Sequence, residues 1–371
     1  MAANPLRQLE NFGQSFWLDF IERRLLGSDQ FRRLLEEDGL KGMTSNPTIF
    51  DKAISGSDDY KQQLAELART SMTTEQICDA LASRDIVTAA DILRPLYDRS
   101  NGKFGYVSYE VSPMLARDTD ATLAEARRIF TAIDRPNLMV KVPGTPEGIP
   151  AFEQLTADGR NINVTLMFSM RHYEDVAEAY MRGLTRRMEK GLSIERIASV
   201  ASVFVSRIDT LVDKTLEKKA GGAKESGANL RGQAGIANTR LIYQRFKQYF
   251  YGSQFRRMAE KGAHVQRPLW GSTGTKDPAY SDVMYVDNLI GPDTVNTMPP
   301  ATIDAFRDHG KPRLSIEEDL QGARDVVRRL ADLGIDLNQV GDQLQNEGVD
   351  LFAKSFQQLL DGVERRRAEL R

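Results

Sequence analysis

Short runs rich in β-branched and aromatic residues alternate with amphipathic helical stretches along almost the whole chain. A length of 371 residues with eight such β–α repeats favours a (β/α)8 TIM barrel over an open doubly wound sheet. No G-x-G-x-x-G follows the first run, which argues against a dinucleotide-binding fold. The predicted strands are 15–20, 42–45, 105–111, 138–142, 161–169, 200–208, 264–271 and 295–298, with helices such as 118–133, 169–190 and 238–261 between them.

Extra helices are expected outside the eight repeats. The segment between the second and third strands is long enough for two helices, 58–68 and 74–97. Ser315 and Glu318 have the spacing of a capping box, which predicts a helix from there to about residue 333. A final helix at 349–367 carries an apolar stripe, so we expect it to cover the outside or the mouth of the barrel.

The chain is predicted to form a single domain. No internal repeat or linker argues for a second unit, so we expect one barrel domain over 1–371, with additional helices at 58–97 and 315–371. The glycine-rich run at 220–235 predicts a mobile loop on the barrel rim. Closure of this loop over a bound phosphate is a hypothesis that its glycine content suggests.

Charge and composition exclude several classes of function. The formal net charge is −2, and no basic tract indicates a nucleic-acid partner. The one cysteine, Cys78, forms no internal disulfide and no thiolate metal site, and the three histidines lack the paired spacing of a zinc site. No apolar segment is long enough to span a bilayer, and the N-terminus lacks the apolar stretch of a signal peptide. We therefore expect a cytoplasmic protein that needs no metal or cofactor.

The run LMVKVPGTPEG, residues 138–148, holds the residue that fits its surroundings least. Its first half has the pattern of a buried strand, and Lys141 lies among apolar neighbours. Burial of an ammonium ion is costly and lowers the pKa of a lysine, which leaves a neutral amine able to attack a carbonyl. The structural alternative is that Lys141 extends its amine into solvent or pairs with a carboxylate.

Polar residues occur late in most of the other predicted strands, which is where a barrel of this type places its working side chains. Together they offer one lysine, two carboxylates, two carboxamides, several hydroxyls and further cations. The set comprises Asp19, Thr44, Asn46, Glu110, Lys141, Asn163, Thr165, Ser202 and Ser272, with Arg207 and Lys276 just beyond their strands.

Each of these residues, taken alone, also has a structural explanation. A carboxylate such as Asp19 or Glu110 often only pairs with a nearby lysine, and Asn or Thr in a strand often satisfies backbone groups. Ser-Asn-Pro is a common turn signal, and Arg207 beside Asp209 has the spacing of a surface ion pair. The functional interpretation rests on the convergence of the whole set on one barrel mouth.

This inventory suits Schiff-base chemistry. A neutral lysine adds to a ketone, and a carboxylate acting through water removes the hydroxyl group of the carbinolamine. The protonated imine then accepts electrons while a base takes a hydroxyl proton and the neighbouring C–C bond breaks. Asp19 and Glu110 could divide these two tasks. Arg207 and the loop Gly271–Lys276 are the candidates for holding a phosphate group.

The sequence resembles the transaldolases over nearly its whole length. Thr-Ser-Asn-Pro after the second strand, Lys-Val-Pro-x-Thr on the fourth and Asn-x-Thr-Leu-x-Phe-Ser on the fifth form a specific triple. The length and the extra helices are similar to the long bacterial transaldolases rather than to the shorter fructose-6-phosphate aldolase branch. The matching stretches are FWLDFI (16–21), KGMTSNPTIF (41–50), GYVSYEVSP (105–113), LMVKVPGTPEG (138–148), NINVTLMFS (161–169), VASVFVSRID (200–209), IANTRLIYQ (236–244) and WGSTGTK (270–276).

The resemblance implies a barrel that is circularly permuted relative to other class I aldolases, and it implies a role for each matching residue. Lys141 would form the Schiff base, and Asp19 would be the acid/base for C–C cleavage. Glu110 and Thr165 would hold the catalytic water. The implied substrate contacts are Asn46, Asn163 and Thr44 for the sugar and Ser202 and Arg207 on the phosphate side.

The loop after the seventh strand departs from the family pattern, in which a serine is followed two residues later by an arginine. Here Ser272 is followed by Gly274, and the nearest cation is Lys276. We therefore expect Ser272 and Lys276 to supply the second phosphate contact.

The expected function is transfer of a dihydroxyacetone unit from sedoheptulose 7-phosphate to glyceraldehyde 3-phosphate, in the non-oxidative pentose phosphate pathway. The products would be erythrose 4-phosphate and fructose 6-phosphate. The first alternative is an enzyme like fructose-6-phosphate aldolase, but the presence of both Asp19 and Glu110 favours the transferase. The second is a non-catalytic sugar-phosphate-binding barrel. At this length we do not expect a fused phosphoglucose isomerase. No membrane partner is expected, and a homodimer is compatible with the sequence.

Overall fold

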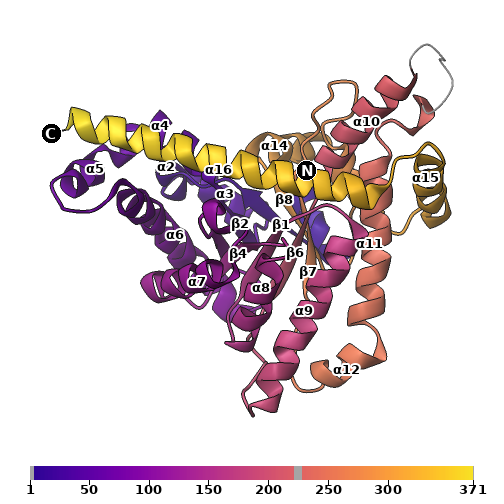
Figure 1. The fold of residues 1–371 in the computed structure, drawn as a ribbon, viewed down its shortest axis with the longest axis horizontal. Helices are drawn as coiled ribbons and strands as arrows, with labels where there is room; N and C mark the ends of the chain where they lie inside the picture. The colour runs from indigo at the N-terminus through magenta and orange to yellow at the C-terminus, as the bar shows by residue number, and fades with distance from the viewer. Residues whose placement is uncertain (1–3, 221–227, 371) are drawn as a thin grey trace.

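Eight parallel strands close into a barrel in chain order, from β1 next to β2 through to β8 next to β1. The computed structural model describes residues 4–220 and 228–370 (Figure 1). The (β/α)8 fold class is confirmed. The strands are β1 (Gln14–Asp19), β2 (Gly42–Thr44), β3 (Tyr106–Glu110), β4 (Leu138–Pro143), β5 (Ile162–Met167), β6 (Ser199–Phe204), β7 (Arg267–Gly271) and β8 (Thr294–Met298).

Helices surround the barrel and pack their apolar faces against it (Figure 1). They are α1 (Pro5–Gln8), α2 (Arg23–Leu26), α3 (Asp29–Glu36), α4 (Pro47–Gly56), α5 (Lys61–Ala68), α6 (Thr74–Arg99), α7 (Thr119–Ile133), α8 (Gly148–Ala157), α9 (Met170–Glu189), α10 (Ser206–Ala220), α11 (Ala234–Phe250), α12 (Ser253–Ala259), α13 (Met284–Asn288), α14 (Pro300–His309), α15 (Leu320–Asp332) and α16 (Leu337–Glu369). Four short 3-10 segments are η1 (Leu9–Phe12), η2 (Asp58–Tyr60), η3 (Pro113–Leu115) and η4 (Ala228–Leu230).

The barrel interior changes from apolar to polar along the strands. Near the strand starts, large side chains such as Trp17, Tyr106 and Met139 fill it and are at most 1% exposed. Because side chains alternate between the two faces of a strand, the residue two positions later on each strand also points inward. Those next residues are polar: Asp19 on β1, Ser108 on β3, Lys141 on β4, Ser202 on β6 and Thr297 on β8. The polar layer therefore lies at the C-terminal mouth.

The long last helix, α16, crosses the C-terminal side of the barrel (yellow in Figure 1). It packs on α4, α6 and α10 and reaches β5, with Leu344, Phe352 and Val363 buried in these contacts. The predicted helix, 349–367, began too late. The added part contains Gly341 and Gly348, which disfavour a helix in isolation, but here the absence of a Cβ lets α16 approach Ser169 and Leu166 closely.

Two other helix predictions were wrong in detail. No capping box forms at Ser315, because its hydroxyl is buried and accepts a hydrogen bond from the Ile290 amide. Asp319 instead caps α15 by accepting from the amide of Gly322 at 2.9 Å. The predicted helix 238–261 is two helices, α11 and α12, which separate at Gly252.

Further expectations concern the glycine-rich loop, membrane-spanning helices and metal sites. Residues 221–227 of the predicted glycine-rich loop lie outside the described residues, and the rest of that run forms η4 and the start of α11. Over 4–220 and 228–370, no helix is long and apolar enough to cross a membrane. Within the same residues, no three His, Cys, Asp or Glu side chains gather in a way that could hold a metal ion.

Gly42 on β2 allows a test of how tightly the barrel is packed beneath the mouth. A Cβ at this position would lie 2.6 Å from the Trp17 ring and 2.8 Å from the carbonyl oxygen of Tyr106. We expect Gly42→Ala to lower the free energy of unfolding by about 1–3 kcal/mol, because the buried ring has no space to move into. Gly27→Ala is the control, since a Cβ at Gly27 would have nothing within 4 Å. Urea unfolding measures both, and equal stability of the two variants would contradict the packing argument.

Candidate active site

Lys141 lies at the centre of the polar layer, between β3 and β5. The strand register places Glu110 and Asn163 directly beside it. Its Nζ donates to the carbonyl oxygen of Ser45 at 2.9 Å and lies 3.2 Å from Glu110 Oε2. The lysine side chain is only 6% exposed, so its amine is held inside the barrel and does not extend into solvent.

Glu110 and Thr165 differ in their partners at this level. Glu110 Oε2 forms an ion pair with the lysine amine, whereas the buried Thr165 Oγ1 has no hydrogen-bond partner among the described residues. Burial raises the pKa of Glu110, and the positive charge of Lys141 opposes this effect. Because an unpartnered buried hydroxyl is costly, Thr165 Oγ1 favours the binding of a polar molecule beside the Lys141–Glu110 pair.

Asp19 ends a chain of hydroxyl groups across the mouth. Thr44 Oγ1 donates to Asp19 Oδ1 at 2.7 Å and lies 2.7 Å from Thr297 Oγ1. Since the one hydroxyl hydrogen of Thr44 points to the carboxylate, Thr297 must be the donor in the second contact. Burial raises the pKa of Asp19, and the charge of Lys141 and the hydrogen bond from Thr44 act against it.

Asn163 is fully buried and joins three strands. Its Nδ2 donates to Ser108 Oγ at 3.0 Å, and its Oδ1 accepts from Ser202 Oγ at 2.6 Å. With the amide in this orientation, one amide hydrogen remains for another acceptor. Ser202 lies against Asn163 deep in the mouth and is 2% exposed.

Asn46 lies at the start of α4, on the other side of the lysine. Its Oδ1 caps the helix by accepting from the Ile49 amide at 3.0 Å, which explains the Ser-Asn-Pro turn signal as an N-cap. Its Nδ2 has no partner among the described residues, so the capping role leaves a donor free.

Arg207 lies on the first turn of α10, because β6 ends at Phe204 and does not continue to residue 208 as predicted. The ion pair with Asp209 does not form. Asp209 is buried and instead accepts from the Gly235 amide and the Tyr285 hydroxyl at 2.8 Å each. The Arg207 guanidinium lies 5.4 Å from the Phe204 ring centre, has no ion-pair partner in the described chain, and has a pKa lowered by burial.

Ser272 and Lys276 belong to the loop that follows β7, on the same side as Arg207. Ser272 has a φ of 54°, which a residue with a Cβ rarely adopts, and its Oγ lies 2.9 Å from Ser206 Oγ. Partial desolvation of the ammonium group and the nearby charge of Arg207 both lower the pKa of Lys276. Two cations that repel each other and form no direct ion pair with a carboxylate among the described residues make a suitable site for an anion.

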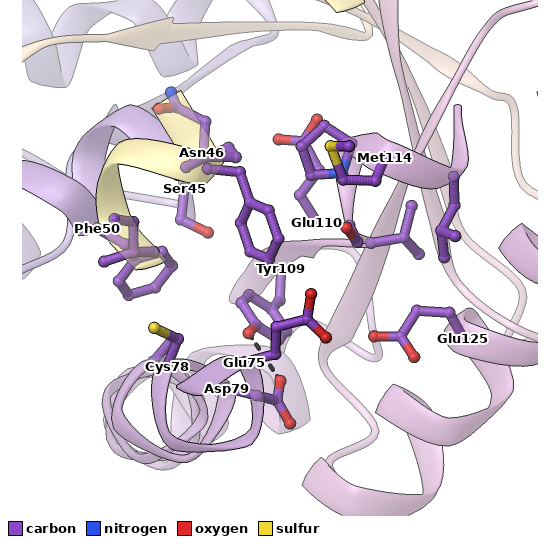
Figure 2. A pocket seen from close by; sticks show the side chains of 18 of the residues that line it. Ser45, Asn46, Phe50, Glu75, Cys78, Asp79, Tyr109, Glu110, Met114 and Glu125 are labelled. Atoms are coloured by element: carbon purple, nitrogen blue, oxygen red, sulfur yellow. Dashed lines mark hydrogen bonds between the residues drawn. The ribbon is translucent and has the colours of Figure 1, made fainter. Parts of the chain in front are cut away.

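A cavity of about 470 Å³ adjoins the site on its β3 side (Figure 2). Ser45, Asn46 and Glu110 line its inner end, while the remainder lies outside the barrel against α6, α7, η3 and α16. Figure 2 shows Cys78 and Asp79 projecting from α6, with Tyr109 donating to Asp79 at 2.9 Å. Burial raises the pKa of the Cys78 thiol to about 12, so this cysteine is unreactive at neutral pH.

The structure thus brings together the residues that the sequence indicated, and it adds three more. The added groups are the Ser45 carbonyl that accepts from Lys141, the Ser108 hydroxyl that accepts from Asn163, and the Thr297 hydroxyl that donates to Thr44. Ser108 and Thr297 could have been found from the alternation along their strands. The Ser45 carbonyl carries no sequence signal, because any residue supplies one.

Comparison with known proteins agrees with this geometry. A family model described as transaldolase/fructose-6-phosphate aldolase matches residues 16–363. The chain belongs to this family. "Transaldolase 2" of Nostoc sp. is 45% identical over 372 residues, covering 98% of each chain. The transaldolase of Thiobacillus denitrificans is 45% identical and covers 96% of this chain and 99% of its own. That of Saccharopolyspora erythraea is 46% identical and covers 96% of each.

The hydroxyl chain at Asp19 makes a testable prediction for this transaldolase-family site. A hydrogen bond to the charged carboxylate lowers its pKa, so Thr44→Val should raise the pKa of Asp19 further. Thr297→Val should raise it by less, because Thr297 acts only through Thr44. NMR titration of ¹³C-labelled carboxyl groups, assigned with Asp19→Asn, measures the change. Thr156→Val, a buried threonine on α8 bonded to the Phe152 carbonyl, is the control. An unchanged or lower pKa in Thr44→Val would contradict the prediction.

Proposed function

We propose that this chain is a transaldolase that uses Lys141 as its Schiff-base lysine. It transfers a dihydroxyacetone unit from sedoheptulose 7-phosphate to glyceraldehyde 3-phosphate, and the products are erythrose 4-phosphate and fructose 6-phosphate. The observation that carries the proposal is the buried amine of Lys141, with a carboxylate 3.2 Å away and carboxamide and hydroxyl groups around it. Family membership supports the same reaction.

The first step joins Lys141 to the ketone carbon of the donor sugar. The amine must be neutral to attack, and Glu110 is close enough to take its proton. Burial raises the pKa of Glu110, which favours the protonated form that results. The attack gives a carbinolamine, whose hydroxyl leaves as water when it receives a proton. We assign this proton transfer to Glu110 and Thr165 acting through a water molecule, since Glu110 faces the amine and the Thr165 hydroxyl has no other partner among the described residues.

The second step breaks the C3–C4 bond of the donor. Asp19 takes the proton of the C4 hydroxyl, the C4 oxygen becomes an aldehyde, and the bonding electrons move into the protonated imine. Erythrose 4-phosphate leaves, and the three-carbon unit stays on Lys141 as an enamine. Its carbon then attacks the aldehyde of glyceraldehyde 3-phosphate, Asp19 returns the proton to the new hydroxyl, and hydrolysis of the imine releases fructose 6-phosphate.

The remaining residues bind the sugar chain and its phosphate. Asn46 and Asn163 each keep a free amide hydrogen for a sugar hydroxyl, and Thr44 and Ser202 line the same mouth. Arg207, Ser272 and Lys276 hold the phosphate, which places it at the end of the site away from Glu110. We propose the cytoplasm as the compartment, because sugar-phosphate metabolism of this kind occurs there. The homodimer stays a prediction, which light scattering would measure.

The Schiff base is tested by borohydride reduction of the protein with fructose 6-phosphate, followed by intact-mass measurement and peptide mapping. We expect a sugar-derived adduct on Lys141 alone, because reduction converts the imine into a stable secondary amine. Lys354→Ala, an exposed lysine on α16, should keep the adduct, whereas Lys141→Arg should lose it. Binding without any adduct would leave a sugar-phosphate-binding barrel without catalysis. Release of free dihydroxyacetone at the transfer rate would instead indicate the aldolase.

Asp19→Ala distinguishes the role of Asp19 from that of Glu110. We expect this variant to form the adduct on Lys141 but to transfer the three-carbon unit about 100- to 10,000-fold more slowly, as loss of an acid/base group does. Glu110→Gln should instead slow adduct formation. Loss of the adduct in Asp19→Ala would show that Asp19 acts in imine formation.

Arg207→Ala tests the phosphate end. Removal of a charge-assisted hydrogen bond to phosphate should raise KM for fructose 6-phosphate about 10- to 100-fold. Activity with unphosphorylated fructose should not change. Lys276→Ala should show the same selectivity, and an effect of equal size on both sugars would contradict the phosphate assignment.

A further inference from the structure

Gln345 of α16 contacts the ends of two strands of the active-site barrel. It is 7% exposed, and its Nε2 donates to the carbonyl oxygens of Gly144 and Leu166 at 2.9 Å each. Both partners are acceptors, so the amide nitrogen and not the oxygen must face them, and both of its hydrogens are used. One side chain from the far end of the sequence thus joins β4 to β5.

These two carbonyls belong to the segments that carry Lys141 and Thr165. Gly144 directly follows the last residue of β4, three residues beyond Lys141, and Leu166 directly follows Thr165 on β5. The Gly144 amide also donates to the carbonyl oxygen of Thr165 at 2.7 Å. The two strand ends and Gln345 therefore form one connected set of hydrogen bonds at the height of the reacting groups.

Leu166 has a backbone conformation that needs outside support. Its φ is 61°, in the left-handed region that a residue with a Cβ avoids, and the pairing of β5 with β6 shifts between Val164 and Met167. Gln345 donates a hydrogen bond to the Leu166 carbonyl. The Leu166 side chain packs against Gly348 of α16, where an added Cβ would lie only 2.8 Å from Leu166 Cδ2. A change in the backbone at Leu166 would rotate the adjacent Thr165, whose hydroxyl has no partner among the described residues.

We propose that Gln345 is a positioning residue that sets the distance between Lys141 and Thr165 during imine formation and hydrolysis. This inference rests on the proposed transaldolase function. Gln345 does not touch the reacting atoms; it acts through the backbone of β4 and β5. A hydrogen-bonding amide is needed here, because the neighbouring buried residues of α16, Leu344 and Val349, are apolar and offer the two carbonyls no donor.

Gln345→Leu removes both donors and keeps nearly the same volume. We expect kcat per active site, counted by borohydride adduct, to fall about 10- to 100-fold, as a small displacement of catalytic groups does. KM for fructose 6-phosphate should stay within about twofold, because the phosphate end is not altered. The rate of adduct formation on Lys141 should fall by the same factor as kcat. Gln343→Leu, an exposed residue of α16 bonded only to Glu347, is the matched control and should behave as wild type.

Gln345→Glu provides a readout that a merely structural role would not move. An ionised carboxylate has no donor and repels the two carbonyls, whereas the protonated form regains one donor. The ratio of its activity to that of wild type should therefore rise as the pH falls, while the ratio for Gln345→Leu stays flat. If Gln345→Leu does not fold, the pH dependence of Gln345→Glu tests the positioning role by itself.

The outcomes separate the inference from the function on which it rests. Failure of the wild type to form an adduct on Lys141 overturns the proposed function. A wild-type adduct with unchanged kcat per site in Gln345→Leu overturns the positioning role alone. A rise in KM without a fall in kcat, or a flat pH ratio for Gln345→Glu, also overturns it.

Discussion

The buried amine of Lys141 is the constraint on which the rest of the mouth depends. An ammonium group that is removed from water needs acceptors close by, and here the Ser45 carbonyl and the Glu110 carboxylate supply them. These acceptors come from the end of β2 and from β3, so the charge can be kept only where the parallel strands hold these neighbours beside β4. The same contacts that make burial tolerable also place a proton acceptor against the nucleophile, which couples the stability of the site to its chemistry.

The two carboxylates differ in their partners, and this difference suits two separate roles. Burial raises the pKa of both. Asp19 is tied to a chain of hydroxyl groups through Thr44, whereas Glu110 is paired with the lysine amine itself. A carboxyl with a fixed hydrogen-bond donor is held in one orientation, as a base for a specific hydroxyl requires. A carboxyl paired with the reacting amine can exchange a proton with it and relay protons through a water molecule.

Most of the barrel could be predicted from sequence, because strand alternation and polar residues late in each strand are local patterns. The polar layer from Asp19 to Thr165 follows from this periodicity alone. The errors arose where tertiary contacts override local signals: Ser315 bonds to the Ile290 amide instead of capping a helix, and Arg207 belongs to α10 because β6 ends early. The start of α16 was missed for the same reason, since its glycines lower helix propensity in isolation and permit close packing in the fold.

Gln345 shows why the active site of a parallel barrel cannot be fully predicted from the residues of its strands. The pairing of β4 with β5 ends at Pro143 and Thr165, and beyond it β5 continues along β6 only after a shift in register. At that point Leu166 takes a conformation that its own sequence disfavours, and the carbonyls that emerge need donors from elsewhere. Helix α16 supplies them from Gln345, which lies 201 residues after Gly144 and 179 residues after Leu166. A helix that looks like a cover for the mouth therefore also completes the backbone geometry on which the strand-end side chains depend.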